Sequence, residues 1–282
     1  MAAAGADGEG ILNLMTDLNQ VDKFYRSQEG EKLAALELLP VIARYRSPGR
    51  LKILEVGCGY GRNIDALSGI PESDFFGCDI SQEDLLKAQD RADLLHRDNI
   101  HLTLQTDANQ LPYADNQFDL VVLWQVLEHV PTREEKRNLL AEVSRVTRSG
   151  GLVLVETPNH FFPIDYHDTN LPLVQYLPAA WRQLLIKKLR QQDFPPSFYT
   201  NVLEIKKFLA AGKNVNAIKK LSLIFFEKSY GEIFKHLGGT RQGNKKIFFW
   251  LYFPFYGLFK MLGIDPDLFT PSVRAVFQVV KG

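Results

Sequence analysis

The stretch that decides the fold is residues 53–63, ILEVGCGYGRN. An apolar run, Lys52–Val56, leads directly into a turn with glycines at positions 57, 59 and 61. Glycine is needed where the backbone adopts a positive φ or where a ligand must come close to the main chain. The pattern therefore predicts a buried strand followed by a ligand-binding turn. A dinucleotide-binding turn would carry a third glycine where Arg62 stands, so the pattern argues against a ligand that contains pyrophosphate.

Strand and helix patterns alternate downstream of this turn. Further strands are predicted at Asp74–Ile80, Ile100–Leu104, Phe118–Trp124 and Leu152–Glu156. Helices are predicted from Ser81 to about Arg97, and from Pro131 to a stop at Ser149-Gly150-Gly151. Ser81 with Asp84, and Thr132 with Glu135, have the spacing of helix-capping boxes. Strands that alternate with helices indicate a mainly parallel sheet with helices on both faces.

This alternation ends after Pro158. Residues Asn159–Ser197 are rich in proline, histidine, aspartate and aromatic residues, which indicates an inserted segment of loops and helix. We expect a basic helix at Leu203–Leu221 and the last two strands at Leu221–Glu227 and Ser272–Val280. Near the start of the chain, Ile11–Arg46 shows helical spacing after a small and polar segment, Met1–Gly10, that we expect to be disordered.

Polar side chains follow the ends of three predicted strands. Asp79 ends the second strand, 22 residues beyond Gly57, which is the separation at which an acid reaches ribose hydroxyls. Asp107 follows the third strand and Gln125 ends the fourth. Ligands of open α/β sheets bind beyond the carboxyl ends of the strands, so these side chains and the turn should converge on one crevice. Taken singly, each of them also fits a turn or helix-capping residue.

In combination, these segments resemble the class I S-adenosylmethionine-dependent methyltransferases. ILEVGCGYGRN is similar to their first motif, GCDIS to their second, TDANQLPYADNQFDLVVLWQVLEHV to their third and fourth segments, and RVTRSGGLVLVETPN to their fifth. The resemblance covers about Lys52–Asn159. It implies a Rossmann-like, doubly wound and mostly parallel α/β sheet of seven strands, with helical insertions near the C-terminus. The LEHV segment, and the lack of an Asn/Asp-Pro-Pro-Tyr motif at Trp124–Leu127, resemble small-molecule members that modify quinones, lipids or sugars more than base-modifying members.

The resemblance implies S-adenosylmethionine as cofactor, with S-adenosylhomocysteine as product. We expect four parts of the chain. These are an N-terminal tail and helical cap (1–46), the cofactor-binding core (47–158), an acceptor-side insertion (159–220) and the last strands with an aromatic helical insertion (221–282). Glu55 favours the positive charge of the cofactor, Asp79 accepts from its ribose, and Asp107 with the Ala108 main chain meets its adenine. The expected cofactor contacts are Glu55, Gly57, Gly59, Gly61, Asp79, Ile80, Asp107, Ala108 and Gln125.

Three histidines are candidates for a general base. Methyl transfer from a sulfonium is an in-line displacement, so alignment in a water-poor pocket can supply most of the catalysis, but a hydroxyl acceptor gains from a base. His129 follows the fourth strand, His160 follows the fifth, and His167 stands between two aspartates two and one residues away. Each also fits a structural hydrogen bond or ordinary loop polarity. We expect no metal site, because His160, Asp165, His167 and Asp168 match no metal-ligand spacing.

Composition indicates a globular protein, with an uneven distribution of charge. The chain lacks the roughly 18 consecutive apolar residues of a membrane-spanning helix, and its first ten residues do not resemble a signal peptide, so we expect it in the cytoplasm. Its two cysteines, Cys58 and Cys78, fit small buried residues better than a disulfide framework. Residues 1–180 hold 16 Lys/Arg against 27 Asp/Glu, whereas residues 181–282 hold 17 against 6. The basic part suits an anionic partner.

The segment Ile247–Leu262, IFFWLYFPFYGLFKML, has eight aromatic residues among sixteen. One interpretation is a buried helical insertion that covers the acceptor pocket. The other is peripheral contact with an acidic membrane through residues 245–262, since Trp250 and Tyr252 stand near Lys245 and Lys260.

The sequence therefore predicts an S-adenosylmethionine-dependent methyltransferase that acts on a small-molecule or lipid- or glycan-linked anionic acceptor, by O-methylation. Carbon and nitrogen acceptors stay open. The alternatives are a nucleic-acid methyltransferase that uses the basic part, and a scaffold that binds the cofactor without catalysis.

Overall fold

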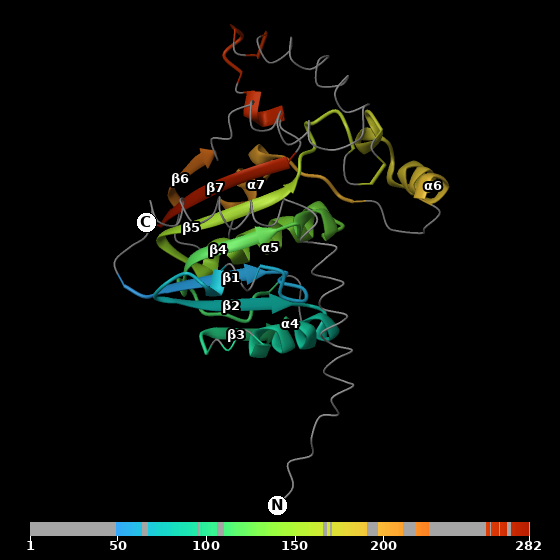
Figure 1. Ribbon diagram of the computed structural model, residues 1–282. Helices are drawn as coiled ribbons and strands as arrows, with labels where there is room; N and C mark the ends of the chain where they lie inside the picture. Colours follow the sequence, from blue (N-terminus) through green and yellow to red (C-terminus); the bar gives the residue numbers. More distant parts are fainter. Residues whose placement is uncertain are drawn as a thin grey trace, which may run out of the picture.

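The computed structural model describes residues 49–63, 67–94, 96, 98–105, 110–165, 168–169, 171–190, 197–210, 218–225, 258–259, 261–264, 266–269 and 272–281. Its strands are β1 (Leu51–Val56), β2 (Ser73–Asp79), β3 (Ile100–Leu104), β4 (Phe118–Trp124), β5 (Thr147–Pro158), β6 (Ile218–Phe225) and β7 (Ser272–Lys281). They form one seven-stranded sheet in the order β3-β2-β1-β4-β5-β7-β6 (Figure 1). Strands β1 to β5 pair in parallel, and β7 is antiparallel to both of its neighbours. The expected mostly parallel sheet of seven strands is confirmed.

The described helices are α4 (Gln82–Leu94), α5 (Arg133–Val146), α6 (Ala179–Arg190) and α7 (Val202–Leu209), with 3₁₀ turns η1 (Leu127–His129), η2 (Val174–Tyr176) and η3 (Pro266–Phe269). The predicted capping box at the start of α5 is present. The Thr132 hydroxyl accepts from the Glu135 amide at 3.1 Å, and the Glu135 carboxylate accepts from the Thr132 amide at 3.1 Å. At the start of α4 the Ser81 hydroxyl accepts from the Asp84 amide at 3.2 Å. None of the described helices is long and apolar enough to cross a membrane.

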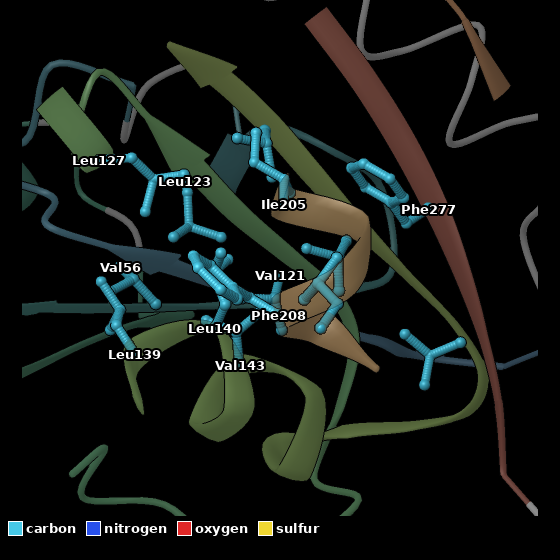
Figure 2. Close-up of a cluster of buried hydrophobic side chains, with 14 of the residues drawn as sticks. Val56, Val121, Leu123, Leu127, Leu139, Leu140, Val143, Ile205, Phe208 and Phe277 are labelled. Carbon is cyan, nitrogen blue, oxygen red and sulfur yellow. The ribbon is translucent and has the colours of Figure 1, made fainter. Parts of the chain in front are cut away.

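Two apolar clusters cover the two faces of the sheet. On one face, buried side chains of β4 and β7 pack against α5 and α7, with Val121, Leu140, Phe208 and Phe277 near the centre (Figure 2). On the other face, Ile53 and Phe75 belong to a second cluster that includes side chains of α4 and residues 67–70. Because alternate residues of a strand point to opposite faces, a fully buried strand such as β4 contributes to both clusters and reads as a continuous apolar run.

Two pairs of predicted boundaries are wrong. The helix expected to stop at Ser149-Gly150-Gly151 ends at Val146, and β5 begins at Thr147 instead of Leu152. Thr147 is buried and pairs with Phe118 of β4, and the register shift that follows passes through Gly150 at φ 79°. The basic helix predicted at Leu203–Leu221 ends at Leu209, and β6 starts at Ile218 because its backbone pairs with β7. The helical prediction for Ile11–Arg46 lies outside the described residues, as does most of Ile247–Leu262.

Candidate active site

The glycine-rich turn after β1 is held against the end of β2. The Gly57 and Cys58 amides both donate to the Cys78 carbonyl, at 2.8 and 3.1 Å. Gly57, Gly59 and Gly61 have φ values of 70°, 50° and 80°, which L side chains rarely adopt. These dihedrals explain why the turn needs glycine.

The first two glycines differ in what a side chain would meet. A Cβ at Gly57 would lie 2.7 Å from Val126 Cγ2, so packing against the residues that follow β4 excludes one. A Cβ at Gly59 would meet no atom within 4 Å. The backbone at Gly59 therefore borders open space, as a turn that a ligand approaches requires.

Asp79 joins three elements of the site. Its Oδ2 accepts from the Gly59 amide at 2.7 Å, and its Oδ1 accepts from the Ser81 amide at 2.9 Å, just before α4. An ionised carboxylate has about four acceptor positions, so each oxygen keeps capacity for a ligand hydroxyl. The neighbouring Ile80 side chain is 68% exposed. The predicted meeting of the turn with the end of β2 is present.

Gln125 meets the same turn from the end of β4. Its Oε1 accepts from an Arg62 guanidinium nitrogen at 3.1 Å, and its amide donates to the Glu156 carbonyl at 2.9 Å. Gln125 has φ 56°, a left-handed conformation that is uncommon for a residue with a side chain. From the sequence, Arg62 served only as an argument against a dinucleotide-binding turn. In the structure it connects the glycine-rich turn to Gln125, directly after β4. Asp107 and Ala108 lie outside the described residues.

Glu55 is a buried carboxyl beneath the turn. One oxygen accepts from the Asn63 side-chain amide, and the other has no hydrogen-bond partner among the described residues. Burial raises its pKa to about 7, against the lowering effects of the Asn63 hydrogen bond and the Arg62 charge. A buried carboxyl with an unsatisfied oxygen is favourable for a cationic group of a ligand.

The topology places these residues at one edge of the sheet. The strand order reverses between β1 and β4, which is the switch point where open α/β sheets bind ligands. The turn follows β1, Asp79 ends β2 and Gln125 follows β4, so they gather at this point. The convergence is a property of the geometry, and their role as cofactor contacts stays a prediction.

The candidate histidines differ in environment. His129 ends η1 and is exposed, whereas His160 follows β5 and is half-buried. The His160 amide donates to the Thr200 carbonyl at 2.7 Å, and its carbonyl accepts from the Tyr176 hydroxyl at 2.9 Å. Burial lowers the pKa of His160 below its ordinary 6.5, although the negative charge of Glu204 acts in the opposite direction. Burial therefore favours the neutral imidazole of His160, the form that accepts a proton. His167 lies outside the described residues.

A buried polar network next to His160 was not predicted. Glu128, in η1, is fully buried and accepts from the Thr157 hydroxyl at 3.0 Å. The buried Lys136 ammonium donates to the Phe198 carbonyl, and burial lowers its pKa to about 8. The Phe198 amide donates to the Glu128 carbonyl at 2.8 Å. One signal was available in the sequence, because Lys136 stands three and four residues before Leu139 and Leu140, on the inner face of α5.

Aspartates order the segment that follows β5. The buried Asp165 carboxylate accepts from the Asp168 amide at 2.9 Å, the Thr169 hydroxyl at 2.8 Å and the Tyr199 hydroxyl. The Asp168 carboxylate accepts from the Ser197 amide at 2.8 Å and from its hydroxyl at 2.9 Å. Within the described part of the chain, no group of three His, Cys, Asp or Glu side chains is placed to hold a metal ion.

Fold and site together define a class. A sheet of order β3-β2-β1-β4-β5-β7-β6 with an antiparallel β7, a glycine-rich turn after β1 and an acid at the end of β2 is the arrangement of class I S-adenosylmethionine-dependent methyltransferases. Residues 54–155 match the family described as "Methyltransferase domain". The fold, the site and this match together support a class I S-adenosylmethionine-dependent methyltransferase domain, with S-adenosylmethionine as its cofactor.

Known proteins agree on the domain and differ in acceptor. The chain is 30% identical over 134 residues to tRNA (carboxymethyluridine(34)-5-O)-methyltransferase of Arabidopsis thaliana, covering 47% of this chain and 29% of that protein. It is 32% identical over 110 residues to phosphatidylethanolamine N-methyltransferase of Cereibacter sphaeroides, covering 39% and 51%. The chain spans about half or less of the length of these relatives. A methyltransferase structure from Clostridium acetobutylicum has the same fold, with a TM-score of 0.56 and 13% identity over 95% of this chain and 98% of that one.

The residues present fit this cofactor. The unsatisfied Glu55 oxygen suits its positive charge, the open space beside Gly59 leaves room at the turn, and Asp79 offers acceptors for a diol. The buried Glu55 carboxyl has no described role in the fold other than its contact with Asn63.

Proposed function

We propose that the chain transfers a methyl group from S-adenosylmethionine to an oxygen of a small-molecule, lipid-linked or glycan-linked acceptor. The observation that carries this proposal is His160, a half-buried histidine with a lowered pKa at the same sheet edge as the turn, next to β5. A hydroxyl acceptor gains more from such a base than a neutral amine does, because a hydroxyl oxygen is a weak nucleophile until its proton is removed.

The cofactor, when bound, supplies a methyl group on a positively charged sulfur. The chain contributes position and proton transfer. The turn and Asp79 orient the cofactor, Glu55 favours its charge, and His160 takes the proton from the acceptor hydroxyl at its ring nitrogen. Most of the rate enhancement is expected from alignment and exclusion of water in the crevice.

Transfer of labelled methyl groups from S-adenosylmethionine into fractionated cell extracts tests the proposal. Label in a lipid, glycan or small-molecule fraction, lost with His160→Asn, supports it. Label only in protein or nucleic acid overturns the acceptor class. Binding of the cofactor without label in any fraction indicates a cofactor-binding scaffold, which overturns the catalytic proposal.

A second candidate is a nucleic-acid methyltransferase. It is favoured by the tRNA-modifying relative and by the 17 Lys/Arg against 6 Asp/Glu in residues 181–282. This function predicts label in RNA or DNA, and nucleic-acid binding that weakens steeply with salt because counterions are released on binding.

A further inference from the structure

Exposed apolar side chains concentrate in two segments of the described chain. Eleven of the sixteen exposed large apolar residues in the described part lie in residues 171–189 or 258–264. The other five are distributed along the rest of the described chain. Single exposed apolar residues are ordinary, whereas a concentration of them marks an interaction surface.

Both segments lie at the edge of the sheet that holds the candidate active site. The Tyr176 hydroxyl contacts the His160 carbonyl, which connects residues 171–189 to the end of β5. On the other side, the Phe259 ring stacks on Phe269 with centroids 4.4 Å apart, and Phe269 lies 5.9 Å from the Phe161 ring. Figure 1 shows α6 beyond the end toward which β5 points, away from the sheet. The exposed apolar side chains of both segments therefore lie at the sheet edge that holds the candidate site.

The segment that carries α6 buries two polar side chains beside the apolar Val174 and Ile186, and it exposes most of its large apolar ones. Its buried side chains include Gln175 and Arg182, and the Arg182 guanidinium donates to the Ser197 carbonyl at 2.6 Å. Its outer side chains include Leu173, 58% exposed, Trp181, 64% exposed, and Leu184, 68% exposed. A helix that served only to cover the core would bury its leucines and expose its arginine. The outer face of α6 is therefore suited to an apolar partner.

The charge of this segment identifies the partner. α6 carries four basic residues and no acid, and no Asp or Glu occurs from Thr169 to Gln192. Lys187 and Lys188 are exposed in the next turn of α6, after Leu184. Tryptophan and leucine beside lysine is the composition of helices that lie at the interface of acidic membranes, where the lysines attract anionic headgroups.

We infer that the outer face of α6, together with residues 258–264, docks on the surface of an acidic phospholipid bilayer. The docking surface would bring the active-site edge to the membrane, so that the acceptor is a molecule dissolved in or attached to the bilayer. This choice of acceptor rests on the proposed function, whereas the docking surface itself does not.

Co-sedimentation with vesicles tests the surface. Vesicles of phosphatidylcholine alone are compared with vesicles that also contain phosphatidylglycerol, using the full chain. The double variant Trp181→Glu, Leu184→Glu should reduce binding to the acidic vesicles at least about tenfold, because two exposed apolar side chains no longer enter the interface. The matched control is Leu86→Glu, Leu94→Glu on α4, where both leucines are also exposed, and it should bind as the wild type does.

The electrostatic part has its own pair of variants. Lys187→Ala, Lys188→Ala should weaken binding to acidic vesicles about twenty-fivefold, from about fivefold for each cation near an anionic surface. Lys206→Ala, Lys207→Ala on α7 removes the same charge from another exposed site and should change binding little. Added salt should weaken wild-type binding and reduce the difference between the two variants.

Several outcomes would overturn the inference. If the wild-type chain does not bind acidic vesicles at any salt concentration, the docking surface is ruled out. This holds even if methyl transfer to an extract fraction is observed. Equal losses in the α6 and α4 variants rule out a specific face. A dimer that forms without vesicles and dissociates in Trp181→Glu, Leu184→Glu identifies a second copy as the partner. If the chain binds vesicles but transfers no methyl group, the docking surface is supported and the proposed function is contradicted.

Discussion

The substitution Glu55→Gln changes the charge beneath the glycine-rich turn with almost no change of shape. The wild-type carboxyl is 2% exposed, and one of its oxygens has no hydrogen-bond partner among the described residues. Burial raises its pKa from an ordinary 4.5 to about 7. Between these two pH values the folded state keeps a proton that the unfolded state releases.

This difference in proton binding makes the protein less stable as the pH rises. The contribution of Glu55 is fully present below its unfolded pKa and is lost as the pH rises through its folded pKa. A shift of one pKa unit corresponds to about 1.4 kcal/mol, so the loss amounts to about 3 kcal/mol between about pH 4 and pH 8. Glutamine can still accept from Asn63 and does not titrate. The free energy of unfolding of Glu55→Gln, measured relative to wild type, should therefore increase by about 3 kcal/mol from about pH 4 to pH 8.

Urea unfolding without cofactor at both pH values measures the gain. Calorimetry at the higher pH should show cofactor binding at least about tenfold weaker in Glu55→Gln, because an ionised partner of the cofactor is lost. Glu134→Gln is the control, since its side chain is 75% exposed. A stability difference that is the same at both pH values would refute the buried-carboxyl argument. Unchanged cofactor affinity would remove Glu55 from the site.

Three further variants test the rest of the site. Gly57→Ala combines a positive φ with a steric clash, so cofactor affinity by calorimetry should fall at least about tenfold, whereas Gly150→Ala, with similar φ and open space around its Cβ, should keep it. His160→Asn should lower kcat at least about a hundredfold and remove the acid limb of the pH–rate profile, which in wild type lies below pH 6.5; an equal loss in the exposed His129→Asn would contradict this. Tyr199→Phe removes a donor to a buried carboxylate and should lower the free energy of unfolding by about 1 to 3 kcal/mol in urea; no change would show that this hydrogen bond is dispensable.

The sheet was predictable because its core strands carry strong local signals. β4 is buried on both faces, so its apolar run had the observed bounds, and the bounds of β3 were also correct. The α5 capping box was visible because it depends on two residues three positions apart. By contrast, β6 was displaced by three residues at its start, because its position depends on pairing with β7 across a large separation in sequence.

The site was predictable only where it follows a strand end. Asp79 and Gln125 were located from the strands that they terminate, and the structure connects both to the turn. Arg62 was missed as a contact because its partner lies 63 residues away. Glu128 and Lys136 were missed for a related reason. Burial of a charged side chain depends on tertiary packing, and sequence statistics place such residues at the surface.

The buried polar network and the exposed apolar surface have a common physical origin. The segment after β5 buries Asp165, Gln175 and Arg182, and it is attached to the domain through hydrogen bonds of the kind made by Tyr199 and Lys136. Buried polar groups that are hydrogen-bonded hold a segment in place, because removing one partner leaves the other buried and unsatisfied. A segment fixed in this way does not need to bury its leucines and tryptophan for its own stability. Those side chains can therefore face outward without loss of the fold, which is the condition that an acceptor-side docking surface requires.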